Sequence, residues 1–179
     1  MTKTQSLVLT AAAALSLSAA LPAAAVTTLF ATSLAGAGEP VPTSPATGSA
    51  SVSFDDVLFK VTVHVEFAGL TAPASASHIH CCTTIPFTGG APVYLGFTGF
   101  PAANSGTYDN SFVLTSTSFA TLLAGAEDGR AYVNIHSPGT YSAGEIRGFL
   151  VPVPEPSTYA LMLGGLTAVG WAARRRRSH

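Results

Sequence analysis

The sequence predicts an all-β domain, an antiparallel Greek-key sandwich or barrel, and three observations support this. The odd-numbered residues of the stretch 57–67 are all valine or phenylalanine and alternate with mostly polar residues, as in a half-buried strand. Roughly seven or eight short strand-like stretches follow one another without long helical segments between them. The 179 residues include 17 glycines and 12 prolines, which suits one domain of ordinary size with frequent turns.

The first 25 residues have the order of regions found in a secretory signal peptide. Lys3 precedes an apolar run over residues 7–21, and the alanines at 23–25 form a small-residue cleavage site. A membrane anchor is the alternative, but the apolar run is short and ends in proline and small residues. We therefore expect this segment to be removed on export, so that the mature chain starts near Val26.

The next part of the chain predicts three strands. The segment 35–48 between the first two contains three prolines, which prevent a regular ladder there. A hairpin turn at Asp55-Asp56 is expected to join the second strand to the third. The expected strands are Val26–Leu34, Ser49–Phe54 and Val57–Phe67. The odd-numbered residues of the third strand should face the core.

The polar face of the third strand carries one histidine, His64. It shares that face with Lys60, Thr62 and Glu66, and such polar neighbours indicate that the face is exposed to solvent. We therefore do not expect His64 to bind a metal ion.

The second half of the domain is expected to hold shorter strands and one helix. A helix of about two turns is predicted over Ser118–Ala126, and Asp128-Gly129 should end it. The expected strands are His78–His80, Val93–Phe97, Asp109–Thr115, Arg130–His136 and Glu145–Val151. The long irregular segment around the Val93 strand is rich in glycine and proline.

Three histidines of this half are candidate metal ligands. His78 and His80 alternate with Ile79, so both project from one face of their strand. His136 projects from the polar face of its own strand. Neutral imidazoles on adjacent strands suit Zn or Cu. A His-x-His pair on a strand of a Greek-key barrel also resembles copper/zinc superoxide dismutase, and both immunoglobulin-like and superoxide-dismutase-like architectures fit the strand pattern.

The polar residues around these histidines leave several interpretations open. The histidines could instead hydrogen-bond to backbone groups, or to an ion pair between Glu145 and Arg147, and so hold the strand ends together. Cys81 and Cys82 should be oxidised in an exported protein. They could form a disulfide with each other, form an intermolecular bridge, or add soft ligands to the metal site.

The last residues predict a linker followed by a single membrane-spanning helix. Residues 152–156 contain three prolines and cannot begin a long helix. Residues 157–173 are almost uninterruptedly apolar, at the short end of what spans a bilayer. The cluster Arg174, Arg175, Arg176 and Arg177 follows directly and should stay in the cytoplasm. A buried core helix is the alternative, which the four arginines disfavour.

Charge and motifs exclude several classes of function. Residues 26–155 hold three cations against nine carboxylates, a formal charge of −6, and therefore lack the basic face that nucleic-acid binding needs. No nucleophile elbow, P-loop or dinucleotide fingerprint occurs in the sequence. We therefore expect neither a nucleic-acid partner nor an enzyme.

The tail resembles a known sorting signal. Pro154-Glu155-Pro156, an apolar segment and a terminal arginine cluster follow one another in that order. Together they resemble the PEP-CTERM signal of exported proteins of Gram-negative bacteria. The resemblance implies a transient inner-membrane anchor that an exosortase-type enzyme removes, and an association with extracellular polysaccharide or biofilm matrix.

Several short motifs spread over the middle of the chain point to a second family. They include Leu34-Ala35-Gly36, Phe67-Ala68-Gly69-Leu70, Ser77-His78-Ile79-His80, Tyr132-Val133-Asn134-Ile135-His136 and Gly144-Glu145-Ile146-Arg147-Gly148. The stretch from about Val26 to Val151 is similar to the CHRD domain, named after chordin. It departs from the common pattern at Cys81-Cys82 and at Phe149. The resemblance implies a fold and a location more than a chemistry, because the family has no established catalytic activity.

We therefore expect an exported, non-catalytic structural or binding module. Signal peptidase and an exosortase-type enzyme would process it, so that it is anchored in the inner membrane first and then reaches the cell surface or matrix. The alternative is a redox or metal-storage protein that binds Zn or Cu through His78, His80 and His136.

Overall fold

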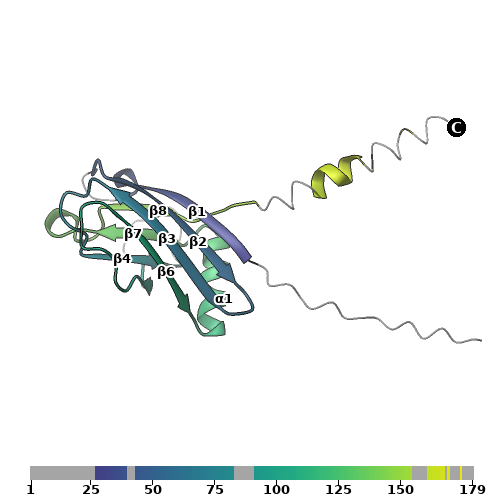
Figure 1. Cartoon of the computed structure of the whole chain (residues 1–179), viewed down its shortest axis with the longest axis horizontal. Coiled ribbons are helices and arrows are strands. Elements are labelled where there is room, and N and C mark those ends of the chain that lie inside the picture. The colour runs from purple at the N-terminus through teal and green to yellow at the C-terminus, as the bar shows by residue number, and fades with distance from the viewer. Residues whose placement is uncertain are drawn as a thin grey trace, which may run out of the picture.

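The strands form one antiparallel sheet that curls into a half-barrel (Figure 1). The computed structural model describes residues 27–39, 43–82, 91–154, 161–167, 169 and 174. Along the sheet the strand order is β5-β4-β7-β8-β1-β2-β3-β6, and β9 also pairs with β1. The strands are β1 (Thr27–Ala35), β2 (Thr47–Asp55), β3 (Lys60–Ala68), β4 (Ala76–His80), β5 (Val93–Gly96), β6 (Gly106–Val113), β7 (Tyr132–His136), β8 (Ile146–Phe149) and β9 (Val151–Pro152). The helices are η1 (Gly36–Gly38), α1 (Ser116–Glu127) and η2 (Gly139–Tyr141).

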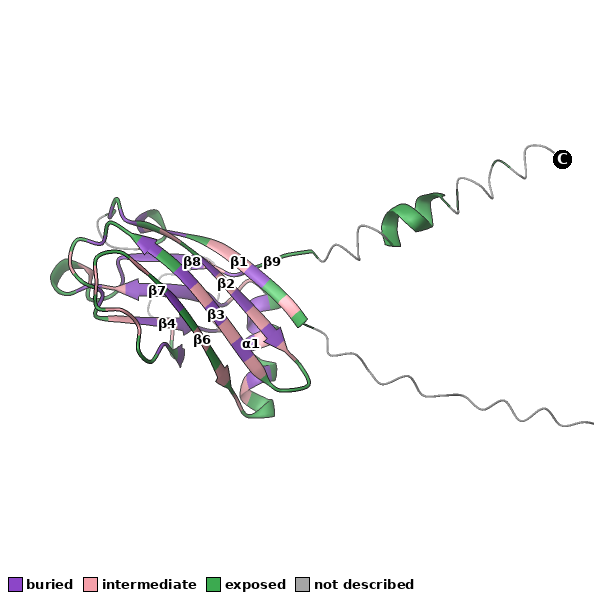
Figure 2. Cartoon of the chain, in the orientation of Figure 1, coloured by how far each residue is buried: buried purple, intermediate pink, exposed green. Residues whose placement is uncertain are grey.

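Four long strands, β1, β2, β3 and β6, form the larger half of the sheet and confirm the expected all-β antiparallel class. Val61, Val63 and Val65 of β3 are fully buried, as the alternation predicts (Figure 2). The rings of Phe30 in β1 and Phe54 in β2 meet edge to face on the core side, with centroids 5.4 Å apart. Each such side chain stabilises the fold by roughly 1.5–3 kcal/mol, so the inner face of this half is the main core.

The third strand begins three residues later than predicted. Residues 56–59 form the turn between β2 and β3, and Asp55 pairs with Lys60 across it. The Asp55 Oδ1 atom accepts hydrogen bonds from the backbone N–H groups of Val57 and Leu58, at 3.1 and 2.9 Å. This capping closes a four-residue turn, with Phe59 at a positive φ of 48°. The prediction that Val57 and Phe59 face the core as strand residues is therefore wrong.

Helix α1 packs against the core beside Phe54 of β2 and the two cysteines that follow β4. Thr115 caps the helix, because its side chain accepts a hydrogen bond from the N–H of Ser118. Phe119 points inward, with its ring 5.7 Å from that of Phe54. The helix has 12 residues, about three turns rather than the predicted two. It begins directly after its cap Thr115, two residues before the predicted start at Ser118. It ends near Gly129, as expected, and this glycine has a φ of 67°.

The last strand extends the domain into the predicted linker. Val151 pairs with Ala31 of β1, and Pro152 pairs with Phe30. The N–H of Val153 then donates a hydrogen bond to the carbonyl of Leu29 at 2.8 Å. Strand β9 thus includes the first residue of the predicted linker, since a proline is tolerated in a short edge pairing that does not need its missing N–H.

A buried carboxylate joins three connecting segments of the domain. Glu145 is fully buried, and its Oε1 atom accepts hydrogen bonds from the Ser44 hydroxyl and the Thr71 N–H, both at 2.8 Å. Its Oε2 atom accepts one from the Ser137 hydroxyl. Burial alone would raise the pKa of Glu145, but these hydrogen bonds outweigh it and lower the pKa below its usual value. The charge is thus held by local donors.

The two predicted export segments are hardly described. Residues 1–25 lie outside the described part of the chain, as do most residues of the tail. Residues 161–167 are helical and exposed. Among the described residues no helix is both long and apolar enough to cross a membrane, so the expected membrane-spanning helix is not supported by the structure.

The alternation in β3 predicts opposite tolerances at two neighbouring residues. Val63→Asp places an unpaired charge in the core and should cost more than about 3 kcal/mol of unfolding free energy. Thr62→Asp loses only the exposed hydrogen bond to Ser111 and should cost less than about 1 kcal/mol. Urea unfolding measures both values, and equal costs would show that the register is wrong.

The donors around Glu145 predict a graded response to substitution. Glu145→Ala leaves the N–H of Thr71 and the buried hydroxyls of Ser44 and Ser137 without acceptors, and should cost about 3 kcal/mol or more. Glu145→Gln keeps one acceptor oxygen and gives Ser137 a donor in place of an acceptor, so it should cost clearly less. Chemical unfolding of both variants tests this, and a glutamine variant as unstable as the alanine variant would contradict it.

Candidate metal centre

Strands β4, β7 and β8 carry polar side chains on the face turned away from the core. The register of β4 and β7 sets His78 opposite Asn134 and His80 opposite Tyr132, and Arg147 of β8 lies opposite Asn134 on the other side. We call this set the polar layer: His78, His80, Tyr132, Asn134, His136 and Arg147. All six residues are buried or half-buried, so this part of the sheet is covered on both faces.

The segment after η1 and the loop before β8 cover the polar layer. The Arg147 Nε atom donates a hydrogen bond to the Gly38 carbonyl and lies 3.8 Å from the Glu39 carboxylate. Gly144 has a φ of 138°, and a side chain there would collide with Asn134 and Glu39. The expected ion pair between Glu145 and Arg147 is wrong, because hydroxyl and backbone donors occupy the Glu145 carboxylate instead.

The three histidines predicted as ligands lie together. His78 and His80 come from β4 and His136 from β7, and one nitrogen of each lies within 4.8 Å of the others. The Nδ1 atom of His78 is 3.3 Å from the Nε2 atom of His136. A tetrahedral Zn site with N–Zn bonds of about 2.0 Å needs nitrogens about 3.3 Å apart. One pair already has this spacing, and the third nitrogen needs a movement of roughly 1.5 Å.

Backbone carbonyls fix the orientation of two of the rings. His80 Nδ1 lies 2.8 Å from the carbonyl of Ala91, and His136 Nδ1 lies 3.1 Å from that of Ser142. A carbonyl only accepts, so each Nδ1 carries the proton and each Nε2 presents a lone pair. The same support orients histidine ligands in known metal sites, where it sets the tautomer.

All three imidazoles are held in the neutral form. Burial and then the neighbouring His136 and His80 lower the pKa of His78 to about 4. Burial also lowers the pKa of His80 and of His136, although the carbonyls of Ala91 and Ser142 partly oppose the effect. A nitrogen that binds a metal ion must be unprotonated, and the lowered pKa values meet this requirement at neutral pH.

Unpaired acceptors gather at the same place. Within the described residues three buried side-chain atoms lack a hydrogen-bond partner: His80 Nε2, Asn134 Oδ1 and Glu39 Oε1. All three are acceptors, and all belong to the polar layer or to the segment that covers it. A buried polar atom without a partner costs about 1–3 kcal/mol, so this concentration calls for a cation or another donor.

Three members of this neighbourhood were not identified from the sequence. The Tyr132 ring stacks on His80, with centroids 4.8 Å apart and planes 7° from parallel, and Arg147 lies 5.2 Å from the Tyr132 centroid. Tyr132 and Asn134 share the period of His136, which is a signal that the sequence does contain. Glu39 offered no such signal, because it reaches the layer from a distant segment.

The cysteines lie on the other side of β4. Cys81 and Cys82 form a disulfide with each other, which was one of three expected possibilities. Cys81 is buried, and the Cys82 sulfur lies 3.7 Å from the carbonyl of Thr121 in α1. Because the disulfide packs against α1, on the core side of the strand, its sulfurs do not point into the histidine cluster.

The remaining predicted site residues are apart from the cluster. His64 is partly exposed, hydrogen-bonded to Asp109 at 2.7 Å, and 3.6 Å from Glu66, in accord with a solvated histidine. Pro154 is the only residue of the sorting motif within the described range, and Glu155 and Pro156 lie outside it. Of the four arginines only Arg174 is described, as an exposed residue.

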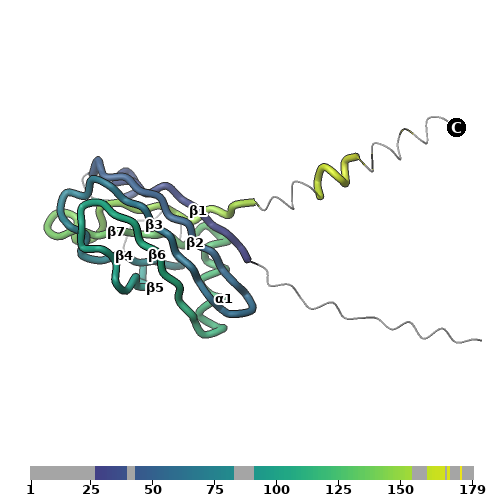
Figure 3. Tube along the Cα trace, in the orientation of Figure 1, coloured from purple at the N-terminus to yellow at the C-terminus, as the bar shows by residue number. Residues whose placement is uncertain are grey.

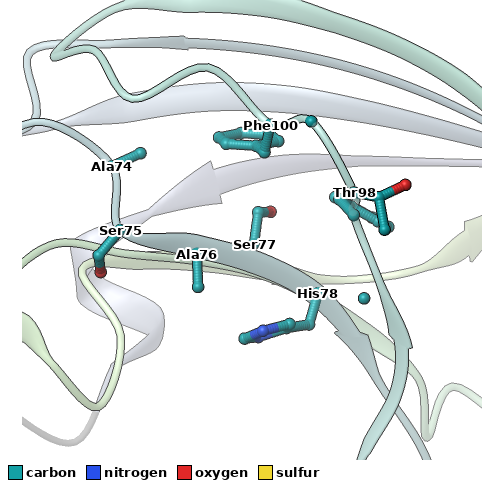
Figure 4. Close-up of a pocket in the computed structure, with 10 residues that line it drawn as sticks. Ala74, Ser75, Ala76, Ser77, His78, Thr98 and Phe100 are labelled. Atoms are coloured by element: carbon teal, nitrogen blue, oxygen red, sulfur yellow. The ribbon is translucent and has the colours of Figure 1, made fainter.

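A shallow groove gives access to the cluster from one side. It has a volume of about 330 Å³ and runs between the start of β4 and the segment after β5. Figure 4 shows Thr98 and Phe100 on one side of it and Ala76 and His78 on the other. His78 lines the groove, so solutes in it can reach the edge of the histidine cluster.

Comparisons with known proteins place both parts of the chain. The model of the CHRD domain matches residues 30–150, which include the whole polar layer, and the model of the PEP-CTERM protein-sorting motif matches residues 152–177. No curated protein and no solved structure matches the chain. Neither matched family is known for catalysis.

The PEP-CTERM motif implies processing by an exosortase and export to the cell surface, so the combination indicates an extracellular protein. The CHRD model covers well over half of the sequence and every strand from β2 to β8. The chain therefore belongs to the CHRD domain family.

Proposed function

We propose that this protein is an exported, non-catalytic binding module that holds one Zn or Cu ion through His78, His80 and His136. The observation that carries the metal proposal is the set of three buried or half-buried imidazoles that each bring one nitrogen within 4.8 Å of the others. Two of them are oriented by carbonyls in the way that metal ligands are. The metal-free structural module, the expectation that the sequence alone favoured, is the competing interpretation.

The chemistry of the ligands limits the choice of metal. Three imidazoles suit Zn or Cu and are poor ligands for Ca²⁺ or Mg²⁺, which prefer oxygen. In the metal-free molecule His78 Nδ1–H donates to His136 Nε2, which has a free lone pair. Metal binding would move this proton to His78 Nε2, so that both facing nitrogens become ligands.

The tail provides the second part of the proposal. The segment 157–173 would anchor the newly exported chain in the inner membrane, with Arg174 to Arg177 in the cytoplasm. Exosortase cleavage close to Pro154-Glu155-Pro156 would then release the domain to the cell surface or the polysaccharide matrix. Three prolines in residues 152–156 disfavour a helix across the cleavage region and so would leave it open to the enzyme.

The metal proposal predicts selective loss of binding. Protein purified without a histidine tag and dialysed against Zn or Cu should retain about one ion per chain by elemental analysis. His80→Ala or His136→Ala should weaken binding at least about 100-fold, since even indirect ligand support contributes 10–100-fold. His64→Ala is the matched control, because it removes a histidine far from the cluster, and it should bind normally. Equal retention by all variants, or by none including the wild type, would refute the metal site.

The sorting proposal predicts the ends of the mature protein. Mass spectrometry of protein from the cell surface should find a chain that begins near Val26 and lacks Trp171. Replacing Glu155 by alanine, or deleting the exosortase, should leave the anchored form with an intact tail. Surface protein that still carries Trp171 in wild-type cells would show a permanent anchor instead.

A further inference from the structure

The exposed apolar side chains of the β domain gather at one end. Six of the eight large apolar residues that are exposed in the described range 27–154 lie there. We call this set the apolar end: Leu29, Val57, Leu58, Phe59, Val113 and Val153. Val113 is 75% exposed, Val57 59% and Leu58 54%, so the surrounding domain leaves these side chains largely in water.

Strand register shows that these residues share one end. Asp55 pairs with Thr27 at the start of β1 and with Lys60 at the start of β3, so the turn 56–59 projects beyond the first strand. Lys60 also pairs with Val113 at the end of β6. Figure 2 shows the turn as an exposed tip. A tip of three consecutive apolar residues is unusual on a surface that faces only water.

The carboxyl-terminal segment leaves the domain at this same end. Strand β9 runs antiparallel to β1, and the N–H of Val153 bonds to the carbonyl of Leu29, two residues from the start of β1. The Cα trace shows the described chain leaving the sheet beside the start of β1 (Figure 3). Four residue steps separate Val153 from Ser157, so the apolar tail segment begins at most roughly 14 Å away.

From these facts we infer that the apolar end is a membrane-docking surface, which rests on the lipid bilayer while the tail anchors the chain. The inference rests on the membrane anchoring proposed above for the tail. An anchor only four residues away holds this end of the domain within reach of the lipid headgroups. Val57 and Leu58 can then enter the interface, as apolar tips of peripheral proteins do, while the Phe59 ring packs behind them against Phe119.

The short distance between the apolar end and the tail segment favours a lipid surface over another protein as the partner. The short linker brings the bilayer to the apolar end of every anchored molecule, whereas a second chain would have to arrive by diffusion. Lys60 beside Val113 supplies an ammonium group that can extend to lipid phosphates. A few apolar side chains give only weak, reversible membrane binding by themselves. Cleavage of the tail would therefore also release the docked domain.

The test uses the full-length protein in vesicles of phosphatidylethanolamine and phosphatidylglycerol. A fluorescent NBD group is attached at Leu58→Cys, with the label at Thr140→Cys as control. Thr140 is exposed in η2, which follows β7 at the opposite end of the sheet. Cys81 and Cys82 are joined in a disulfide, so the introduced thiol is the one that reacts. Trp171, the sole tryptophan, reports separately on insertion of the tail.

Nitroxide lipids labelled near the headgroup should quench the label at residue 58 at least about 3-fold more than the label at residue 140. Residue 58 should also be protected from iodide in the water. If nitroxide lipids quench Trp171 but not residue 58, the tail is inserted and the docking inference is wrong. If Trp171 is not quenched, the anchoring proposal itself fails and the docking inference fails with it. Iodide protection of residue 58 without lipid quenching would mean that a second protein chain covers the apolar end, which also overturns the inference.

Discussion

The pairing of β4 with β7 is the constraint on which the candidate site depends. Side chains alternate across a strand, so a slip of one residue would turn His78 and His80 into the core and bring Ile79 out. Ile79, Val133 and Ile135 are all fully buried on the core face. Hydrophobic burial on one face therefore fixes the positions of the imidazoles on the other. The positions of the three histidine side chains are therefore set by core packing and not by contacts among the histidines.

Covering the outer face of these strands costs folding free energy, because it buries polar atoms of the polar layer without hydrogen-bond partners. A half-barrel of this size needs only one buried face, yet Glu39 and the loop before β8 also close the other. The covering leaves His80 Nε2, Asn134 Oδ1 and Glu39 Oε1 without a hydrogen bond, although Arg147 Nε lies 3.8 Å from Glu39 Oε1. Burial raises the pKa of Glu39, although Arg147 opposes this. Optimisation for stability alone would have replaced such groups by apolar ones. The open His80 Nε2 fits a binding role, because a cation held by the three histidines would satisfy it.

The sequence was informative where one local rule governed the outcome. Alternation predicted the buried residues of β3 from Val61 to Phe67, and the same rule on two strands predicted that the three histidines are turned away from the core. The rule failed at Val57 and Phe59, since the period continues through a turn that the Asp55 side chain creates. Alternation also could not predict that the histidine face is buried. That burial depends on Glu39 and Gly144, which approach only in the folded chain.

The proposed metal site and the proposed docking surface lie at opposite ends of the domain. The β1–β8 pairing joins Ala35 to Arg147, so the polar layer lies toward the end of β1 that is remote from Leu29 and Val153. An anchored molecule would therefore hold its apolar end against the lipid and its histidine cluster away from it, toward the exterior. Cleavage near Pro154 would cut outside the ordered strands and leave every contact of the histidines intact. Sorting and metal binding can then be independent, because the constraint that shapes the cluster lies entirely within the β domain.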